Sequence, residues 1–245
     1  MLVLKEPGHA GSSPLKVLRA GGPYLASQQG RHLVNLLCII VAGGTGAVVA
    51  GFLLHPILGL VCALASAAPA RRQYAKLSSY RKGIAGEELV STLLARLSDD
   101  FCLVNDVKVR GYRGNIDHVL IGPCGVVAIE TKNYQGLVTC DRNEWFKNGR
   151  RIRNISRQAR GGARALRDWL KDTFPAFRPF LLDHVEDVVV YTHPLCRLEI
   201  NRPGSTIVRY SELLNVISVK AERRVLDPSQ SLRIGDALAR RAKGS

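Results

Sequence analysis

The sequence predicts an α/β domain, a mixed sheet flanked by helices, preceded by an apolar segment long enough to cross a membrane. Residues 33–70 contain no Asp, Glu, Lys or Arg. After Tyr80, short apolar runs of strand length alternate with segments of helical periodicity, the pattern of a mixed sheet with helices on its faces. The 245 residues carry a net charge of +15 and are 46% hydrophobic, which excludes a fully disordered chain.

The first part of the chain is expected to be a flexible tail, residues 1–32, rich in glycine and proline. One helix over residues 33–70 would be about 57 Å long, nearly twice the roughly 30 Å hydrocarbon thickness of a bilayer. A transmembrane helical hairpin, broken near His55-Pro56, is therefore expected. A single tilted span, a re-entrant arm and a pair of buried core helices are the alternatives. A secretory signal ending at Ala65-Ser66-Ala67 is disfavoured, because the apolar run is too long.

Basic residues on both sides of the apolar segment predict its orientation. Positive flanks prefer the cytoplasmic side, so both ends of the segment are expected there. The predicted localisation is the cytoplasmic membrane, with the following domain facing the cytoplasm. The six cysteines form no CxxC pair and have no zinc-ligand spacing, which agrees with a reducing compartment. The flanking cations are Lys5, Lys16, Arg19 and Arg31 before the segment, and Arg71, Arg72, Lys76, Arg81 and Lys82 after it.

The later elements follow from periodicity and turn residues. A helix over 84–97 is expected to bury Gly86, Val90, Leu93, Leu94 and Leu97. Strands are expected at 101–109, 115–122, 125–132, 186–192 and 207–208, with a short strand or loop running to about Lys147. Helices are expected at 154–172, from Ser211 and near 229–241. The expected divisions are a basic linker at 71–79, a domain at 80–220 and a C-terminal helical tail at 221–245.

Three charged residues are predicted to meet on the two central strands. With a two-residue turn at Pro123-Cys124, Asp117 lies directly across from Glu130. Lys132 lies two residues beyond Glu130 and therefore on the same face. Neighbouring carboxylates repel unless a cation bridges them, and such oxygen ligands suit Mg²⁺ or Mn²⁺. Lys132 could then orient or deprotonate an attacking water beside a phosphate. A salt-bridge cluster on a solvated sheet face is the alternative.

A fourth carboxylate is expected at the edge of this site. On the helix over 84–97, Glu87 borders the apolar face, whereas Glu88 points away from it. Glu87 is therefore the expected additional acidic group.

These residues lie in three segments: Gly83-Ile84-Ala85-Gly86-Glu87, Ile116-Asp117-His118-Val119-Leu120-Ile121-Gly122 and Gly125-Val126-Val127-Ala128-Ile129-Glu130-Thr131-Lys132-Asn133-Tyr134-Gln135-Gly136. The segments resemble a known family, the nuclease-related domain, over roughly residues 80–192. That family is similar to the PD-(D/E)xK nucleases, which implies a restriction-endonuclease-like fold. The resemblance implies that Asp117, Glu130 and Lys132 form the catalytic core, that Glu87 is the acidic residue of the first helix, and that Gln158 joins them. The proline that usually precedes the helix of Gln158 is replaced by Asn154-Ile155.

A row of cations marks the helix expected at 154–172. Its members recur at spacings of three and four residues and form one stripe, opposite an apolar face. Such a stripe suits a nucleic-acid backbone, because each contact releases counterions. A solvated helix face and contact with anionic lipid are the alternatives. The stripe consists of Arg153, Arg157, Arg160, Arg164, Arg167 and Lys171.

The sequence thus predicts a membrane-anchored, Mg²⁺- or Mn²⁺-dependent enzyme that hydrolyses phosphodiester bonds of DNA, with RNA as a further candidate partner. Glu87, Asp117 and Glu130 are the predicted metal ligands. The alternative is a non-catalytic, membrane-anchored module that binds nucleic acid and keeps a vestigial nuclease site. A scaffold that faces lipid is a third interpretation.

Overall fold

The computed structural model describes residues 15–19, 23–175 and 185–243 of the chain. It divides into two compact units, Pro23–Ala85 and the combination of Met1–Gly22 with Gly86–Ser245. Of the flexible tail expected over residues 1–32, residues 1–14 and 20–22 lie outside the described residues. Residues 23–32 are helical and not a flexible tail, because α1 begins at Pro23.

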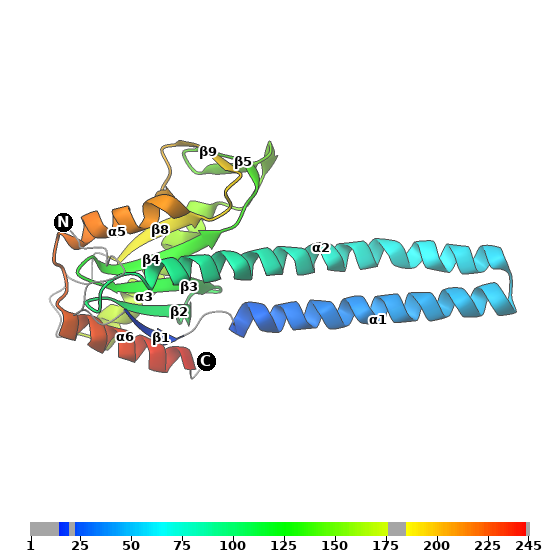
Figure 1. Cartoon of the computed structure of the whole chain (residues 1–245), viewed down its shortest axis with the longest axis horizontal. Coiled ribbons are helices and arrows are strands. Elements are labelled where there is room, and N and C mark those ends of the chain that lie inside the picture. Colours follow the sequence, from blue (N-terminus) through cyan, green and yellow to red (C-terminus); the bar gives the residue numbers. More distant parts are fainter. Residues whose placement is uncertain (1–14, 20–22, 176–184, 244–245) are drawn as a thin grey trace. The chain divides into compact units, whose positions relative to one another are not determined.

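The first unit is formed by two long helices, α1 (Pro23–Leu53) and α2 (Pro56–Leu94), of which α2 continues into the second unit (Figure 1). The predicted interruption at His55-Pro56 is confirmed, because α2 begins at Pro56, where a proline costs no helical hydrogen bond. The segment expected as a linker, residues 71–79, is helical and lies within α2.

Small residues let α1 and α2 approach each other closely. A Cβ atom on Gly43 would lie 2.4 Å from the Cβ of Ser66, and one on Gly59 would lie 2.7 Å from the carbonyl oxygen of Ala47. Further along, the His32 ring lies 2.9 Å from Oε1 of Gln73. Packing of this kind is typical of helices that associate through glycine and serine faces.

One stretch among the described residues, Ser27–Leu53, is long and apolar enough to cross a membrane. None of its most apolar window is buried within the protein, and Val41 and Phe52 are 65% and 89% exposed. The alternative of buried core helices does not fit this segment. Exposed apolar surface of this extent indicates contact with another apolar phase or partner.

The second unit is built on a six-stranded mixed sheet with the order β1-β2-β3-β4-β8-β10. β2, β3 and β4 are antiparallel neighbours, whereas β1 runs parallel to β2, β8 parallel to β4 and β10 parallel to β8. The strands are β1 (Lys16–Arg19), β2 (Cys102–Lys108), β3 (Asn115–Gly122), β4 (Gly125–Lys132), β8 (Val185–Tyr191) and β10 (Thr206–Arg209).

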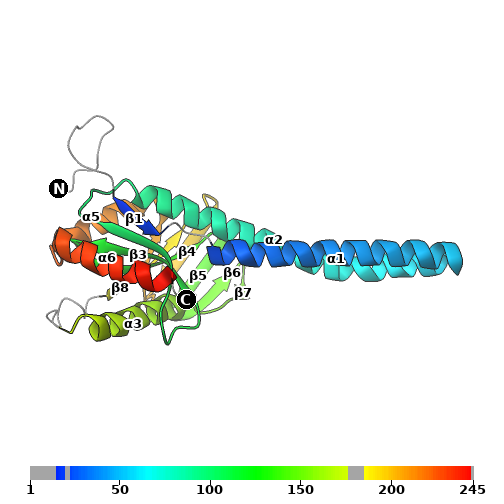
Figure 2. The ribbon, with the colours of Figure 1, turned by 90° about the horizontal axis from the view of Figure 1, so that it is seen from below.

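Helices cover both faces of this sheet. The face that carries Val104, Val126 and Val185 packs against α3 (Ile155–Thr173) and α6 (Pro228–Lys243), which lie on the same side in Figure 2. The opposite face packs against the end of α2 and against α5 (Leu213–Ala221), which follows the short helix η1 (Tyr210–Glu212). The expected mixed α/β architecture is therefore confirmed.

A second, smaller sheet has the order β7-β6-β5-β9. It packs on the N-terminal half of α3 through Val138, Trp145 and Ile155. Its strands are β5 (Gly136–Asp141), β6 (Glu144–Lys147), β7 (Arg150–Arg151) and β9 (Cys196–Asn201). The sequence pattern predicted only a short strand or loop here, because these strands are short and half-exposed.

Two further differences concern the ends of the chain. Residues Lys16–Arg19, within the expected tail, form β1 and pair with β2. The expected C-terminal tail forms α6, which buries Ile234 and Leu238 against the sheet and so belongs to the domain core. The helix expected over 84–97 ends at Leu94, although Leu97 is buried as predicted.

Candidate active site

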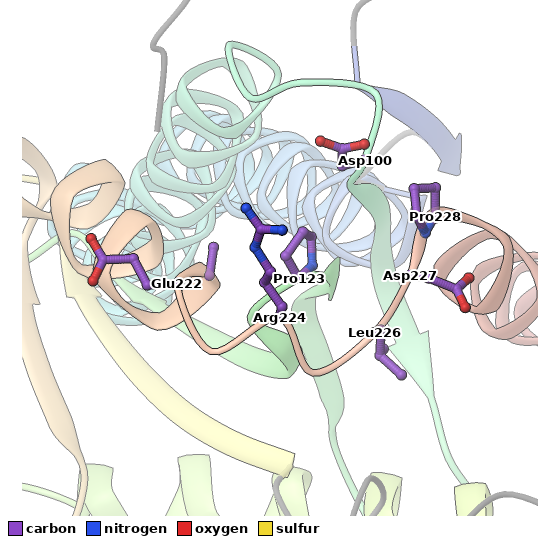
Figure 3. Close-up of a pocket in the computed structure, with 8 residues that line it drawn as sticks. Asp100, Pro123, Glu222, Arg224, Leu226, Asp227 and Pro228 are labelled. Carbon is purple, nitrogen blue, oxygen red and sulfur yellow. The ribbon is translucent and has the colours of Figure 1, made fainter. Parts of the chain in front are cut away.

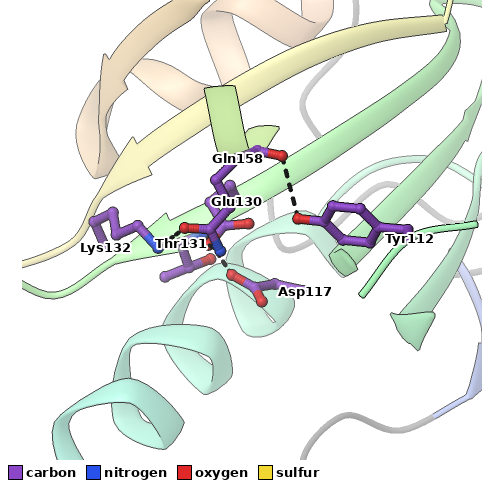
Figure 4. Close-up of polar contacts among 6 residues, drawn as sticks. All are labelled: Tyr112, Asp117, Glu130, Thr131, Lys132 and Gln158. Carbon is purple, nitrogen blue, oxygen red and sulfur yellow. Dashed lines mark hydrogen bonds and ion pairs between the residues drawn. The ribbon is translucent and has the colours of Figure 1, made fainter. Parts of the chain in front are cut away.

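The central hairpin places the two predicted carboxylates at the same end of neighbouring strands. Gly122 pairs with Gly125 and the ladder continues to His118 and Ile129, which is the predicted register. The ladder ends there, so Asp117 is not a paired residue. Its Oδ2 instead accepts the backbone N–H of Thr131 at 2.7 Å, next to Glu130 (Figure 4).

Lys132 and Gln158 converge on a single oxygen of Glu130. The Lys132 Nζ lies 2.5 Å from Glu130 Oε1, and Gln158 Nε2 donates to the same atom at 2.6 Å. Lys132 Nζ also lies 3.4 Å from Gln158 Oε1, which closes a triangle of three side chains. Glu130 is only 5% exposed. The alternative of a solvated salt bridge does not fit this burial.

The charges of this cluster shift one another's protonation. Burial raises the pKa of Asp117 well above its usual range, and the neighbouring charges of Glu130 and Glu87 raise it further. Lys132 and the Thr131 amide act in the opposite direction without cancelling the rise. Burial alone would lower the pKa of Lys132, but Glu130 and Asp117 outweigh it and raise that pKa. Lys132 is therefore held in its charged form.

Glu87 reaches this cluster from α2, and it is partly buried whereas Glu88 is exposed, as predicted. Burial, Asp106 and Glu130 raise the pKa of Glu87 to about 7. Asp106 was not predicted as a site residue. It is 8% exposed, has a φ of 53° within strand β2, and accepts a 2.6 Å hydrogen bond from Asn115 Nδ2. The polar pair at 105–106 inside an apolar strand was the available sequence signal.

Tyr112 is a second residue that sequence reasoning missed. Its hydroxyl donates to the backbone oxygen of Gln158 at 3.2 Å, and its ring lies against Gly161 and Gly162 of α3 (Figure 4). Burial, together with the charges of Glu130 and Asp117, raises the pKa of Tyr112 to about 12. It sits on a loop, where no periodicity could have located it.

The predicted metal ligands share the right chemistry but are not a preformed cage. Among the residues that the structure describes, no group of three or more His, Cys, Asp or Glu side chains is arranged to hold a metal ion. Burial is the largest cause of the raised pKa values of Asp117 and Glu87, and the neighbouring carboxylates raise them further. Neighbouring carboxylate oxygens are the kind of donor that a divalent cation such as Mg²⁺ prefers.

The cationic stripe lies on a different side of α3 from Gln158. Arg157, Arg160, Arg164 and Lys171 are exposed, and Arg167 is half-buried, opposite a buried face that includes Leu166. Arg153 does not belong to the helix, because Asn154 is the N-cap and accepts the N–H of Arg157 at 2.8 Å. Asn154 thus takes the place of the usual proline by capping the helix with its side chain.

Two pockets lie away from the acidic cluster. One, of about 450 Å³, has four arginines of the stripe and Asp187 on its wall, and its described lining residues include none of the predicted catalytic side chains. The other, of about 490 Å³, lies at the turn end of the central hairpin, around Pro123 and Arg224 (Figure 3). Neither pocket coincides with the predicted catalytic residues.

Comparison with known proteins identifies the family that this part of the chain resembles. Residues 82–192 match the family model of the nuclease-related domain, a range that contains all five predicted catalytic residues. The chain contains a nuclease-related domain. Over 61 residues the chain is 39% identical to an uncharacterized protein of Bacillus anthracis, and the match covers 23% of this chain and 29% of that protein. No solved structure matches the chain. In the nuclease-related domain described here, the family segment of β4 supplies Glu130 and Lys132, and that of β3 supplies Asp117.

Proposed function

We propose that the nuclease-related domain hydrolyses phosphodiester bonds of DNA in a reaction that depends on Mg²⁺ or Mn²⁺. The supporting observation is the convergence of Asp117, Glu130, Lys132 and Gln158 at one end of the β3–β4 hairpin. The two carboxylates can hold a metal ion, and the Lys132 ammonium can stabilise negative charge on the phosphate. The Gln158 amide orients the Glu130 carboxylate.

Asp117 and Glu130, with Glu87 directly or through water, would hold the cation. A bound divalent ion supplies Lewis acidity and lowers the pKa of a coordinated water. Glu130 Oε1 is engaged by Lys132 and Gln158 in this structure, so the cation has to compete with the Lys132 ammonium for that oxygen.

Lys132 would orient the attacking water and offset charge on the phosphate. Because its pKa is raised, the amine is a proton donor rather than a base at neutral pH. Gln158 would hold the Glu130 carboxylate in place, and the Tyr112 hydroxyl would in turn hold the backbone of Gln158. The stripe of α3 would contact the phosphate backbone of DNA, or of RNA.

The anchor in this proposal is a transmembrane hairpin formed by α1 and the apolar start of α2. β1 precedes α1 in the chain, and β2 follows α2, yet the two strands pair in one sheet. Both ends of the apolar segment therefore lie on one side, and an inserted segment crosses the membrane an even number of times. The basic flanks favour the cytoplasm for that side. A reporter active only in the cytoplasm should work at either terminus, and activity at one terminus alone would contradict the hairpin.

A plasmid-nicking assay on the full-length protein in detergent tests the enzymatic proposal. With Mg²⁺ or Mn²⁺ the wild-type protein should convert supercoiled DNA to nicked or linear forms, and Asp117→Asn should reduce this to background. Asp99→Asn is the matched control, because Asp99 is exposed and lies outside the cluster. Equal rates for wild type and Asp117→Asn would indicate a contaminant and end the proposal.

The second candidate function is binding of nucleic acid without cleavage. The Lys132–Glu130 ion pair favours this alternative, because the Lys132 ammonium neutralises the buried Glu130 carboxylate without a metal ion. Under this alternative, the wild-type protein and the Asp117→Asn variant bind DNA with the same affinity. Neither protein cleaves single-stranded, duplex or branched DNA.

A further inference from the structure

We propose that the turn joining β6 and β7 is a phosphate-binding site that holds the nucleic-acid strand entering the candidate active site, with Lys147 and Arg150 as its cations. The inference rests on the proposed function, because it specifies how the same substrate would be held. It concerns the small sheet, to which neither the sequence pattern nor the family match assigns a role.

Lys147 and Arg150 are directly opposed in the β6–β7 pair, so their side chains project from the same face. That face also carries Trp145, which is two residues before Lys147 and only 1% exposed. Like charges in opposed positions destabilise a strand pair. An anion placed between them would remove this repulsion.

The turn itself is rigid. Asn148 and Gly149 have φ values of 48° and 73°, the conformation of a tight two-residue hairpin turn. Asn148 donates its N–H to the Leu137 oxygen at 2.8 Å and accepts the Leu137 N–H through Oδ1 at 2.8 Å. Gly136, with a φ of 94°, leaves the space that Asn148 fills, since a Cβ there would lie 2.4 Å from Asn148 Oδ1. These contacts fix the backbone of the turn that carries the two cations.

This fixed turn lies beside the acidic cluster. The Lys147 ammonium is 4.6 Å from the centre of the Tyr134 ring, and Tyr134 follows Lys132 by two residues. Tyr134 is also among the groups that raise the pKa of Lys132. The Tyr134 ring also lies edge-on to Tyr191, with 6.3 Å between the ring centres. Tyr134 thus contacts the cation of the turn and lies two residues from the lysine of the candidate active site.

The surrounding charge favours a polyanion. Residues 142–153 contain Glu144 as the single acid, and Glu144 is paired with Arg151 at 2.8 Å. It therefore leaves the charges of Lys147 and Arg150 uncompensated within this segment. A nucleic-acid backbone presents phosphates in series, so one phosphate can lie at the turn while another lies at the candidate active site. The contact of Lys147 with Tyr134, which follows Lys132 by two residues, is why we assign the reacting strand to the turn.

The test is salt-dependent binding of fluorescein-labelled DNA, single-stranded and duplex, to the full-length protein in zwitterionic detergent with EDTA, so that nothing is cleaved. Log affinity falls as log KCl rises, and the double variant Lys147→Gln/Arg150→Gln should make this slope less steep. The expected reduction in steepness is about 1.8 for duplex DNA and about 1.4 for single-stranded DNA. Lys147→Arg/Arg150→Lys keeps both charges and should retain the wild-type slope. Arg96→Gln/Arg240→Gln removes two exposed cations elsewhere and is the matched control.

The outcomes separate the two proposals. Wild-type protein that binds DNA, with an unchanged slope in the glutamine variant, overturns the phosphate site but leaves the proposed function intact. Wild-type protein without salt-sensitive binding overturns both. An equal loss in the charge-preserving variant, at an unchanged melting temperature, also overturns the phosphate site. A glutamine variant that loses only its binding to phosphatidylcholine–phosphatidylserine vesicles would assign the turn to lipid and overturn the proposal.

Discussion

The two sides of α3 have opposite electrostatic character. On one side, Gln158 reaches into a cluster of carboxylates in which Glu130 is almost fully buried. On the other, Arg157, Arg160 and Arg164 are exposed to solvent. The sequence places the two sets next to each other along the chain, but the helix separates them by its rotation of about 100° per residue. Proximity in sequence therefore did not mean a common surface.

The difference has an energetic consequence. Buried charges interact strongly because little water screens them, so a few groups determine the protonation of the acidic cluster. Exposed cations are screened over about 10 Å at ordinary ionic strength, and each contributes little. Single substitutions should therefore have large effects in the cluster, whereas the stripe should respond only to combined changes, and mainly through salt dependence.

The largest effect is expected at Lys132. Lys132→Met keeps the length of the side chain but removes its charge, and should lower the rate of DNA cleavage at saturating substrate by about 100- to 1,000-fold. Lys76→Met is the matched control, because Lys76 is exposed and lies outside both the cluster and the stripe, and it should change that rate less than threefold. A Lys132→Met protein that cleaves at the wild-type rate would show that the cluster is structural.

The buried face of α3 provides the next contrast. Leu166→Ala should lower the free energy of unfolding by about 2–5 kcal/mol, because Leu166 is fully buried and its removal leaves a cavity. Arg164→Ala, two residues earlier and exposed, should change it by less than about 0.5 kcal/mol. Urea unfolding followed by tryptophan fluorescence measures both, and similar losses in the two variants would contradict the assignment of the faces.

A smaller effect is expected from the stripe. Arg157→Gln combined with Arg164→Gln should reduce the slope of log affinity against log KCl for duplex DNA by about 1.8, as two backbone contacts require. Either single substitution should give about half of that change. An unaltered slope would mean that these arginines are solvated or contact lipid instead.

The smallest expected effect is the titration of Glu87 in metal-free protein. Its pKa of about 7 in the folded state lies above the ordinary 4.5, so the folded protein binds this proton more tightly than the unfolded chain does. The contribution of Glu87 to the free energy of unfolding is therefore greatest below pH 4.5 and declines as the pH rises from 4.5 to about 7. Asp106→Asn should lower the pKa of Glu87, because Asp106 contributes more to the shift than any other neighbouring charge.

Carboxyl ¹³C NMR of the metal-free protein measures this titration. Asparagine is suited to the test, since it tolerates the positive φ of position 106. A Glu87 pKa that stays near 7 in Asp106→Asn would show that Asp106 does not contribute to the shift and would contradict this prediction.

The central hairpin was predictable in detail because it depends on local pattern. A two-residue turn at Pro123-Cys124 and the apolar runs beside it determine the register as far as the pair of His118 and Ile129. The predicted pair of Asp117 and Glu130 lies just beyond the end of this ladder, and Asp117 bonds to the Thr131 amide instead. The helix carrying Gln158 was predictable from its apolar periodicity.

Other features were not predictable in the same way, because they depend on contacts between distant segments. β1 is a strand only because β2 accepts it, and Asp106 and Tyr112 meet the cluster through tertiary packing. The β6–β7 turn is different: Asn148-Gly149 is a strong hairpin signal in the sequence. It was overlooked because the strands beside it are only four and two residues long.

The pairing of β1 with β2 also constrains the order in which the domain can fold. Lys16 is synthesised before α1, whereas its partner Cys102 emerges only after α2. Closing so long a loop costs entropy and slows folding unless something first brings its ends together. Association of α1 with α2 would do so, because it brings together residues far apart in the chain, such as His32 and Gln73. The association of the two helices would therefore precede the pairing of β1 with β2 and reduce its entropic cost.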